Sequence, residues 1–150
     1  MATADDVPAL VALMRAFYAE SGYPLPEGPA ARTFAVLVAD PALGRVWLLE
    51  ADGAPAGYLA MTVAFSMEHG ATRAFVDDLF VLPAARGRGL AAAPPAAARA
   101  DCAARGAHAM YVEVGPDDDG ARRVYARAGF EDTGRVLLAR ALAAPLHLAE

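Results

Sequence analysis

The stretch VDDLFVLPAARGRGLA, residues 76–91, joins an apolar run to a turn that holds two glycines and two arginines. The run Val76–Leu82 is typical of a buried strand, and Pro83 ends it. The alanine-rich residues that follow the turn predict a helix over about 90–104. Glycines let the backbone approach a ligand, and the first N–H groups of a helix are free. The turn at 86–91 is therefore suited to bind an anion such as a pyrophosphate.

Three other glycine-rich motifs fit this turn poorly. A Walker A loop needs a lysine, and the chain contains none. A dinucleotide-binding fingerprint needs a third glycine and a place in the first strand–helix unit. An arginine–glycine segment that binds nucleic acid would need repeats and a basic tail, whereas the net charge here is −5. A glycine-rich turn with solvated arginines is the structural alternative to an anion site.

The elements expected on both sides of the turn alternate in a way that indicates an α/β or α+β domain. Asp52-Gly53, between two strand-like runs, is a strong hairpin signal. The expected elements are helices at 5–20, 30–40, 90–104 and 118–128, strands at 46–50, 57–63, 74–82 and 108–114, and a closing hairpin over 130–142 around Thr133-Gly134.

Composition and charge limit the classes of function. With 150 residues, the chain has room for one domain, which we place at 1–150. The single cysteine, Cys102, allows no internal disulfide, and Asp5 and Asp6 stand where a signal peptide would be basic, so we expect a cytoplasmic protein. The acidic net charge and the lack of a long apolar run argue against nucleic-acid and membrane partners. The three histidines lack the spacing of metal ligands.

Two motifs together resemble the GNAT superfamily of N-acetyltransferases. The strand followed by Arg86-x-x-Gly89-x-Ala91 is similar to that family's acyl-CoA signature, Arg/Gln-x-x-Gly-x-Gly/Ala. Further along, Asp118-x-x-Ala121-x-x-x-Tyr125-x-x-x-Gly129-Phe130 is similar to its second motif, Asn-x-x-Ala-x-x-x-Tyr-x-x-x-Gly-Phe. The order of the elements is similar as well, so the resemblance covers nearly the whole chain. It implies a mixed, mostly antiparallel central sheet flanked by helices.

The resemblance implies acetyl-CoA as co-substrate and no metal. The strand before the glycine turn would carry a bulge and offer backbone groups to the pantetheine arm, and the amides of the turn would hold the pyrophosphate. The next strand, near Glu113 and Val114, would splay away and leave a slot for the thioester. The implied cofactor-binding residues are Leu79, Phe80, Val81, Arg86, Gly87, Arg88, Gly89, Leu90, Ala91, Asp118 and Tyr125.

The resemblance also implies catalytic roles. Tyr125 would protonate the leaving thiolate, since a phenol with a pKa near 10 can act as a general acid, although a tyrosine packed in the core is the structural alternative. Asp77 would take the proton of the amine, with Glu113 as a second candidate, and Glu68 would contact a cationic acceptor. Each of these carboxylates could instead belong to a solvated or structural ion pair. Because neighbouring residues of a strand face opposite sides, we expect Asp77 and Asp78 on different faces.

Three features depart from the family pattern. Asp118 replaces the usual asparagine, Pro94-Pro95 would delay or distort the helix after the turn, and the first strand is absent or reduced to Met1-Ala2. Two functions therefore stay open. One is an N-acetyltransferase that acts on a primary amine of a small molecule or peptide, which the acidic residues predict to be cationic. The other is a non-catalytic acyl-CoA-binding or protein-interaction module. The shortened sheet edge would also suit a homodimer.

Overall fold

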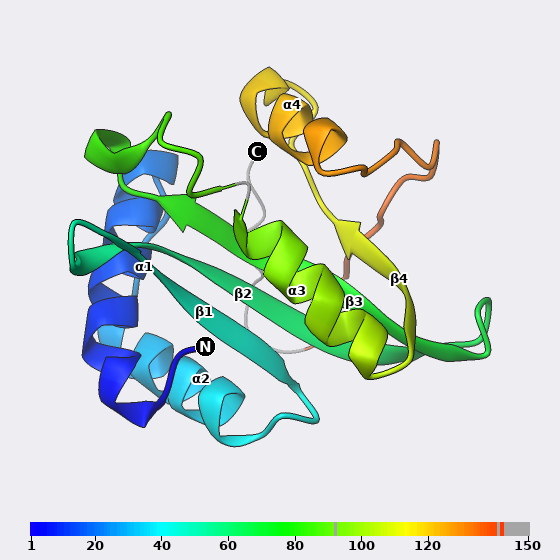
Figure 1. Cartoon of the computed structure of the whole chain (residues 1–150), viewed down its shortest axis with the longest axis horizontal. Coiled ribbons are helices and arrows are strands. Elements are labelled where there is room, and N and C mark those ends of the chain that lie inside the picture. Colours follow the sequence, from blue (N-terminus) through cyan, green and yellow to red (C-terminus); the bar gives the residue numbers. More distant parts are fainter. Residues whose placement is uncertain (92, 141, 143–150) are drawn as a thin grey trace.

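The computed structural model describes residues 1–91, 93–140 and 142, and it places helices on both faces of one sheet (Figure 1). The strands follow the order β1-β2-β3-β4, with β1 to β3 antiparallel and β4 parallel to β3. This is the mixed, mostly antiparallel sheet that the sequence predicts. The elements are η1 (Ala4–Asp6), α1 (Val7–Ser21), α2 (Glu27–Ala39), β1 (Gly44–Ala51), β2 (Ala54–Ser66), β3 (Ala71–Val81), η2 (Pro83–Ala85), α3 (Ala93–Ala104), β4 (Ala107–Val112) and α4 (Asp119–Arg127).

The first helix begins close to the acidic residues that predict its start. The side chain of Asp6 accepts hydrogen bonds from the backbone N–H of Thr3 (2.7 Å) and from its hydroxyl (3.0 Å), which ties down the entry to the helix. Pro8 is the second residue of α1, where its missing N–H would have no partner within the helix. Gly22 ends α1 with a left-handed φ of 74°.

The hairpin between β1 and β2 has the predicted two-residue turn. Asp52 and Gly53 have positive φ angles of 54° and 76°, which is the geometry of a type I′ turn. The twist of this turn matches that of the strands, so it fixes the register in which Ala51 lies opposite Ala54. The Asp52-Gly53 hairpin is therefore confirmed.

The sheet separates two hydrophobic cores. The core between the sheet and helices α1 and α2 is rich in aromatic rings, whereas the core beneath α3 and α4 contains more small and aliphatic side chains. The buried members of the first core are Leu10, Val11, Leu13, Ala30, Phe34, Val46, Tyr58, Ala60 and Phe80. Those of the second are Trp47, Leu49, Ala56, Leu59, Met61, Ala74, Val76, Val81, Ala85, Ala98, Cys102 and Tyr125.

The proline pair delays α3, as the sequence predicts. The helix begins at Ala93, so Pro94 and Pro95 are its second and third residues. At these positions the backbone N–H groups have no acceptor within the helix, and proline therefore removes no helical hydrogen bond. The consequence is that α3 starts a few residues after the glycine turn instead of continuing directly from it.

The predicted closing hairpin over 130–142 is wrong for the part that the structure describes, because residues 130–140 form no strand. Side chains close the turn instead. Asp132 Oδ1 accepts the N–H of Gly134 at 2.8 Å, and Thr133 Oγ1 accepts that of Arg135 at 3.3 Å. These local bonds occupy amides that a strand ladder would use. Residue 141 lies outside the described residues, as do residues 143–150 and with them His147.

The edge of the sheet beside β1 carries only a remnant of a first strand. Ala2 donates its backbone N–H to the carbonyl oxygen of Val46 at 2.8 Å. The sequence predicts a first strand that is absent or reduced to Met1-Ala2, and among the described residues no strand other than β2 pairs with β1.

Candidate functional site

The site begins where β3 and β4 part. Their ladder runs from Thr72 to Val76 on β3 and from Ala107 to Val112 on β4, and it ends there. Figure 1 shows the two strands diverging beyond this point, β3 toward η2 and β4 toward α4. The remaining part of β3, residues 77–81, is paired with β2 on one side only among the described residues. This leaves an open strand edge with backbone hydrogen-bonding groups.

A β-bulge lies at the point of divergence. Ala60 on β2 is opposite Asp78, and the next residue, Met61, is opposite Val76, so Asp77 is the extra residue on β3. The bulge therefore precedes the Leu79–Val81 segment that the sequence analysis assigns to the pantetheine arm. A bulge adds local twist, and here it coincides with the loss of pairing to β4.

The bulge places both aspartates on one face, so the expectation that they point to opposite faces is wrong. Asp78 accepts a hydrogen bond of 2.8 Å from the hydroxyl of Tyr58, which belongs to the core beneath α1 and α2. Asp77 is hydrogen-bonded to the side chain of Thr62. Thr62 follows Met61, which packs on the opposite face, so strand alternation puts Thr62 on the α1/α2 face as well. The extra residue cancels the alternation between the two carboxylates.

Burial changes the acidity of this carboxylate pair. The pKa of Asp78 is raised, mainly because burial disfavours its charge and further because Asp77 lies nearby, while the hydrogen bond from Tyr58 opposes the rise. Partial desolvation also raises the pKa of Asp77, against the effect of the hydrogen bond with Thr62. The side chain of Asp77 is exposed to solvent and that of Asp78 is partly buried. Asp77 is thus the accessible member of the pair.

The glycine turn follows β3 and η2. Gly87 and Gly89 have φ angles of 76° and 79°, and no neighbour would meet a Cβ at either position. The amide of Arg86 already donates to the carbonyl oxygen of Pro83, at 3.2 Å. In the part of the chain that the structure describes, no backbone acceptor is recorded for the amides of residues 87–90. Of the six amides expected to bind phosphate, that of Arg86 is therefore engaged.

Both arginines of the turn are held by carboxylates from other elements. Arg86 donates two hydrogen bonds to Glu20, of 2.8 and 2.7 Å, and its Nε donates to the carbonyl oxygen of Val81 at 2.9 Å. Arg88 forms a bidentate pair with Asp52, at 2.8 and 3.0 Å. These pairs fix the turn against α1 and against the β1–β2 hairpin.

Tyr125 extends from α4 into the core beneath α3 and α4. Its side chain is buried, and its ring meets that of Phe130 edge-on at 5.3 Å between centroids. Burial, followed by the charges of Asp78 and Asp118, raises the pKa of Tyr125 to about 12. Asp118 caps α4 by accepting the N–H of Ala121 at 2.8 Å, a role that aspartate performs well at a helix N-terminus.

Three other predicted site residues lie outside the bulge and the glycine turn. Glu113 is exposed, just beyond the end of β4, and Val114 joins the edge of the core. Glu68 lies in the β2–β3 turn and forms two hydrogen bonds with Arg135, of 2.8 and 3.0 Å, which lower its pKa. The structure therefore groups Asp77 and Asp78 at the bulge and places Glu68 at the opposite end of β3. Sequence reasoning missed Tyr58, since nothing in its apolar run marks it as the partner of a carboxylate.

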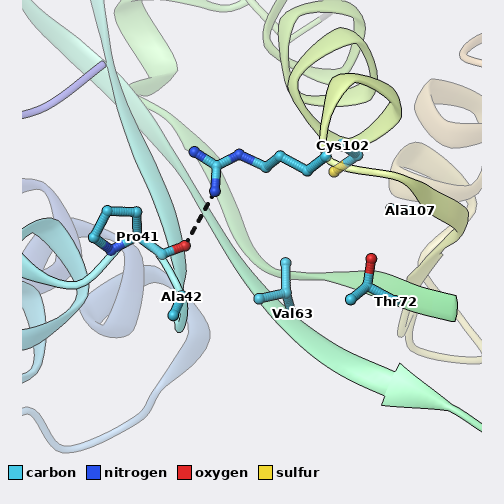
Figure 2. A pocket seen from close by; sticks show the side chains of 7 residues that line it. Pro41, Ala42, Val63, Thr72, Cys102 and Ala107 are labelled. Carbon is cyan, nitrogen blue, oxygen red and sulfur yellow. Dashed lines mark hydrogen bonds between the residues drawn. The ribbon is translucent and has the colours of Figure 1, made fainter.

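Cys102 is part of a separate pocket. The pocket has a volume of about 280 Å³ and lies at the start of β3 and β4, away from the glycine turn (Figure 2). Arg105 lines it and donates to the carbonyl oxygen of Pro41 at 3.3 Å. The thiol of Cys102 is buried and lies 3.2 Å from the sulfur of Met61, and burial raises its pKa, so it is a packing residue. The described residues contain neither a metal-binding cluster nor a helix suited to crossing a membrane.

Comparisons with known proteins agree with this geometry. The sequence model of the acetyltransferase (GNAT) family matches residues 10–130. The solved integron cassette protein HFX_CASS3, from the mobile metagenome of Cole Harbour Salt Marsh, is 46% identical, with 97% of this chain and 91% of that chain covered and a TM-score of 0.88. The aminoglycoside N-acetyltransferase AAC(6')-Iy in complex with CoA is 19% identical, with 95% and 92% covered and a TM-score of 0.80, and so shows the fold alone. The same holds for ribosomal-protein-alanine N-acetyltransferase from Brucella melitensis biovar Abortus 2308, at 18% identity, 93% and 96% coverage and a TM-score of 0.72. Among curated proteins, none matches the sequence.

Proposed function

Because the chain belongs to the GNAT family of acetyltransferases, we propose that it transfers the acetyl group of acetyl-CoA to a primary amine by direct attack. The observation that carries the proposal is the divergence of β3 and β4 directly before a glycine turn. An open strand edge can bind an amide-containing arm, and clustered N–H groups can bind phosphates. The nearby carboxylate pair and Tyr125 offer groups that can move protons.

The residues present fit acetyl-CoA at the turn and at the strand edge. We assign the phosphates to the amides of residues 87–91 and the pantetheine arm to the open edge of β3 at 79–81. Asp118 supports this site by capping α4, the helix that carries Tyr125. Arg86 and Arg88 contribute to phosphate binding only if they leave Glu20 and Asp52. When bound, acetyl-CoA supplies the acetyl group as a reactive thioester.

Tyr125 is the proposed general acid. Its raised pKa, about 12, keeps the phenol protonated at neutral pH. As the amine nitrogen bonds to the acetyl carbon, the carbon–sulfur bond breaks and its electron pair leaves with sulfur, which takes the phenol proton. The proton that nitrogen loses returns to the phenolate through solvent. Bonds and charges then balance, and the products are an amide and a thiol.

Asp77 is the proposed general base, and Glu113 is the second candidate. Asp77 is exposed at the bulge, and its raised pKa makes its carboxylate a stronger base than an ordinary aspartate. An amine that arrives as an ammonium ion can therefore lose a proton to it, directly or through water. With Asp78 beside it, this end of the site attracts a cationic amine, whether of a small molecule or of a peptide.

The test is amine-dependent release of free CoA from acetyl-CoA, measured with a thiol reagent for the wild type and for Tyr125→Phe. The variant should lower kcat by about a hundredfold or more, since it removes a general acid, and should leave the affinity for acetyl-CoA unchanged. Tyr23→Phe, which removes a phenol from the α1–α2 connection, is the matched control and should retain full turnover. A fully active Tyr125→Phe enzyme would refute the assignment of the acid.

One observation favours a second function, a non-catalytic acyl-CoA-binding or protein-interaction module. Both arginines of the turn are engaged in ion pairs within the chain. Such a module would bind acetyl-CoA or a partner without releasing CoA in the presence of any amine. Amine-dependent release would therefore exclude it. The homodimer expected from the shortened sheet edge stays a prediction.

A further inference from the structure

One face of β3 carries a positive charge near the start of the strand and a negative charge at the bulge. Arg73, Phe75 and Asp77 alternate with Ala74 and Val76, which pack in the core beneath α3 and α4. The first three residues therefore share the opposite face, the one on which α1 and α2 lie farther along the sheet. The side chains of Arg73 and Asp77 are both exposed. In Figure 1, the β2–β3 hairpin projects beyond α1 and α2, which lie over the other end of the sheet.

The positive end is a preorganised cluster. The guanidinium carbon of Arg73 lies 5.4 Å from the centroid of the Tyr111 ring, a cation–π arrangement. The hydroxyl of Tyr111 and Nε2 of His69 share a hydrogen bond of 3.0 Å. The carboxylate of Glu68, which senses the charge of Arg73, is already bound by Arg135 through two hydrogen bonds. Among the described residues named in this cluster, two guanidinium groups thus meet one carboxylate, which leaves a net positive charge.

The negative end is the bulge with its two aspartates. Tyr111 lies opposite Phe75 in the β3–β4 ladder, and its hydroxyl bonds His69 in the β2–β3 turn, so the guanidinium of Arg73 over its ring belongs to the hairpin end of the strand. Asp77 is four residues beyond Arg73, a separation of roughly 13 Å between the two Cα atoms at the rise of a β-strand. A ligand that bridges the two side chains meets a carboxylate with one end and a guanidinium with the other.

We propose that the acceptor is a short amino-carboxylate, a primary amine whose own carboxylate binds to Arg73 while its amine lies at Asp77. This inference rests on the proposed function and narrows it. A polyamine or another polycation would place a second positive charge against Arg73 and Arg135, and like charges repel. A carboxylate at the same position gains a charge-assisted hydrogen bond. Arg73 is then a specificity-determining residue, and Tyr111 positions its guanidinium.

The experiment compares matched acceptors with the wild type and one variant. The acceptors are 4-aminobutyrate and butylamine, which differ by the carboxylate, with O-phosphoethanolamine as a second anionic amine. The wild type should have a kcat/KM at least tenfold higher for 4-aminobutyrate than for butylamine. Arg73→Met should lower kcat/KM for 4-aminobutyrate by roughly ten- to a hundredfold, mainly through KM, and leave butylamine unchanged. Arg99→Met, which removes an exposed arginine from α3, is the control and should change neither value.

The possible outcomes distinguish failure of this inference from failure of the proposed acetyl transfer. Equal kcat/KM for 4-aminobutyrate and butylamine would overturn the inference but leave acetyl transfer intact, as would preference for a polyamine such as spermidine. Preference for O-phosphoethanolamine over 4-aminobutyrate would overturn the choice of a carboxylate. A parallel loss with both acceptors in Arg73→Met would show a structural role for Arg73 and would also overturn the inference. If neither acceptor is acetylated, the inference fails, whereas the proposed function fails only if no amine releases CoA.

Discussion

The two faces of the sheet are packed in different ways. One face holds its helices firmly, and the other lies beside the candidate binding site. Beneath α1 and α2, aromatic rings stack on one another: Phe17 lies 5.3 Å from Phe80, and Phe34 lies 5.6 Å from Tyr58, between centroids. Beneath α3, the buried side chains among the described residues 96–104 of the helix are Ala98 and Cys102. Large rings bury far more apolar surface than alanine does, so α1 and α2 are held to the sheet more firmly than α3.

The strands part on the side of the sheet where the helices are held less firmly. β3 and β4 diverge on the side of α4, and α3 begins at Ala93, after the glycine turn. An element with few large buried contacts opens at lower free energy than a dense core does. The aromatic core beneath α1 and α2 can therefore hold the carboxylate pair in place, while the small side chains of α3 leave room for a ligand.

The largest expected effect tests this contrast directly. Phe34→Ala should lower the free energy of unfolding by about 3–5 kcal/mol, because it removes a buried ring and leaves a cavity. Cys102→Ala, an equally buried position on the other face, should cost about 1 kcal/mol. Urea denaturation of both variants measures the difference. Equal losses would contradict the claim that α1 and α2 are held to the sheet more firmly than α3.

The sequence predicts the fold well where local signals dominate. Asp52-Gly53 marks its hairpin because only a few residue types accept two positive φ angles in succession. Pro94-Pro95 predicts the late start of α3, because proline cannot follow a completed helical turn without a steric clash. The cap at Asp118 and the left-handed Gly129 are likewise local features.

Nonlocal features are the ones that the sequence could not predict. The family resemblance implies a bulge in this strand, but its position at Asp77 depends on how β3 pairs with β2, and no residue type in VDD signals that position. As a result, strand alternation alone could not predict that Asp77 and Asp78 share a face. It also could not predict the hydrogen bond from Tyr58 to Asp78. The expected strands after Gly129 fail for a related reason. Asp132, Thr133 and Arg135 bind to nearby groups and to Glu68, and a periodicity argument does not count such bonds.

A smaller effect is expected from the titration of Asp78, the buried carboxyl group on the α1/α2 face. Because burial raises the pKa of Asp78, the folded protein binds a proton more tightly than the unfolded chain does, and stability decreases as the pH rises through the pKa of the folded state. Asp78→Asn lacks this titration and can still accept the hydrogen bond of Tyr58. The stability of the variant relative to the wild type should therefore increase from about pH 4 upward until Asp78 is ionised. Thermal unfolding over this pH range measures it, and a difference that stays constant with pH would contradict the burial of the carboxyl group.

The central claim is that the open edge of β3 and the glycine turn bind acetyl-CoA. Calorimetric titration of the purified protein with acetyl-CoA tests it most directly, with Gly89→Val as the matched variant. A side chain at a φ of 79° is strained, so valine should distort the turn while the two cores stay intact. The account predicts micromolar binding to the wild type and at least a tenfold loss in the variant, with near-normal thermal stability. No binding to the wild type at millimolar acetyl-CoA would contradict the account.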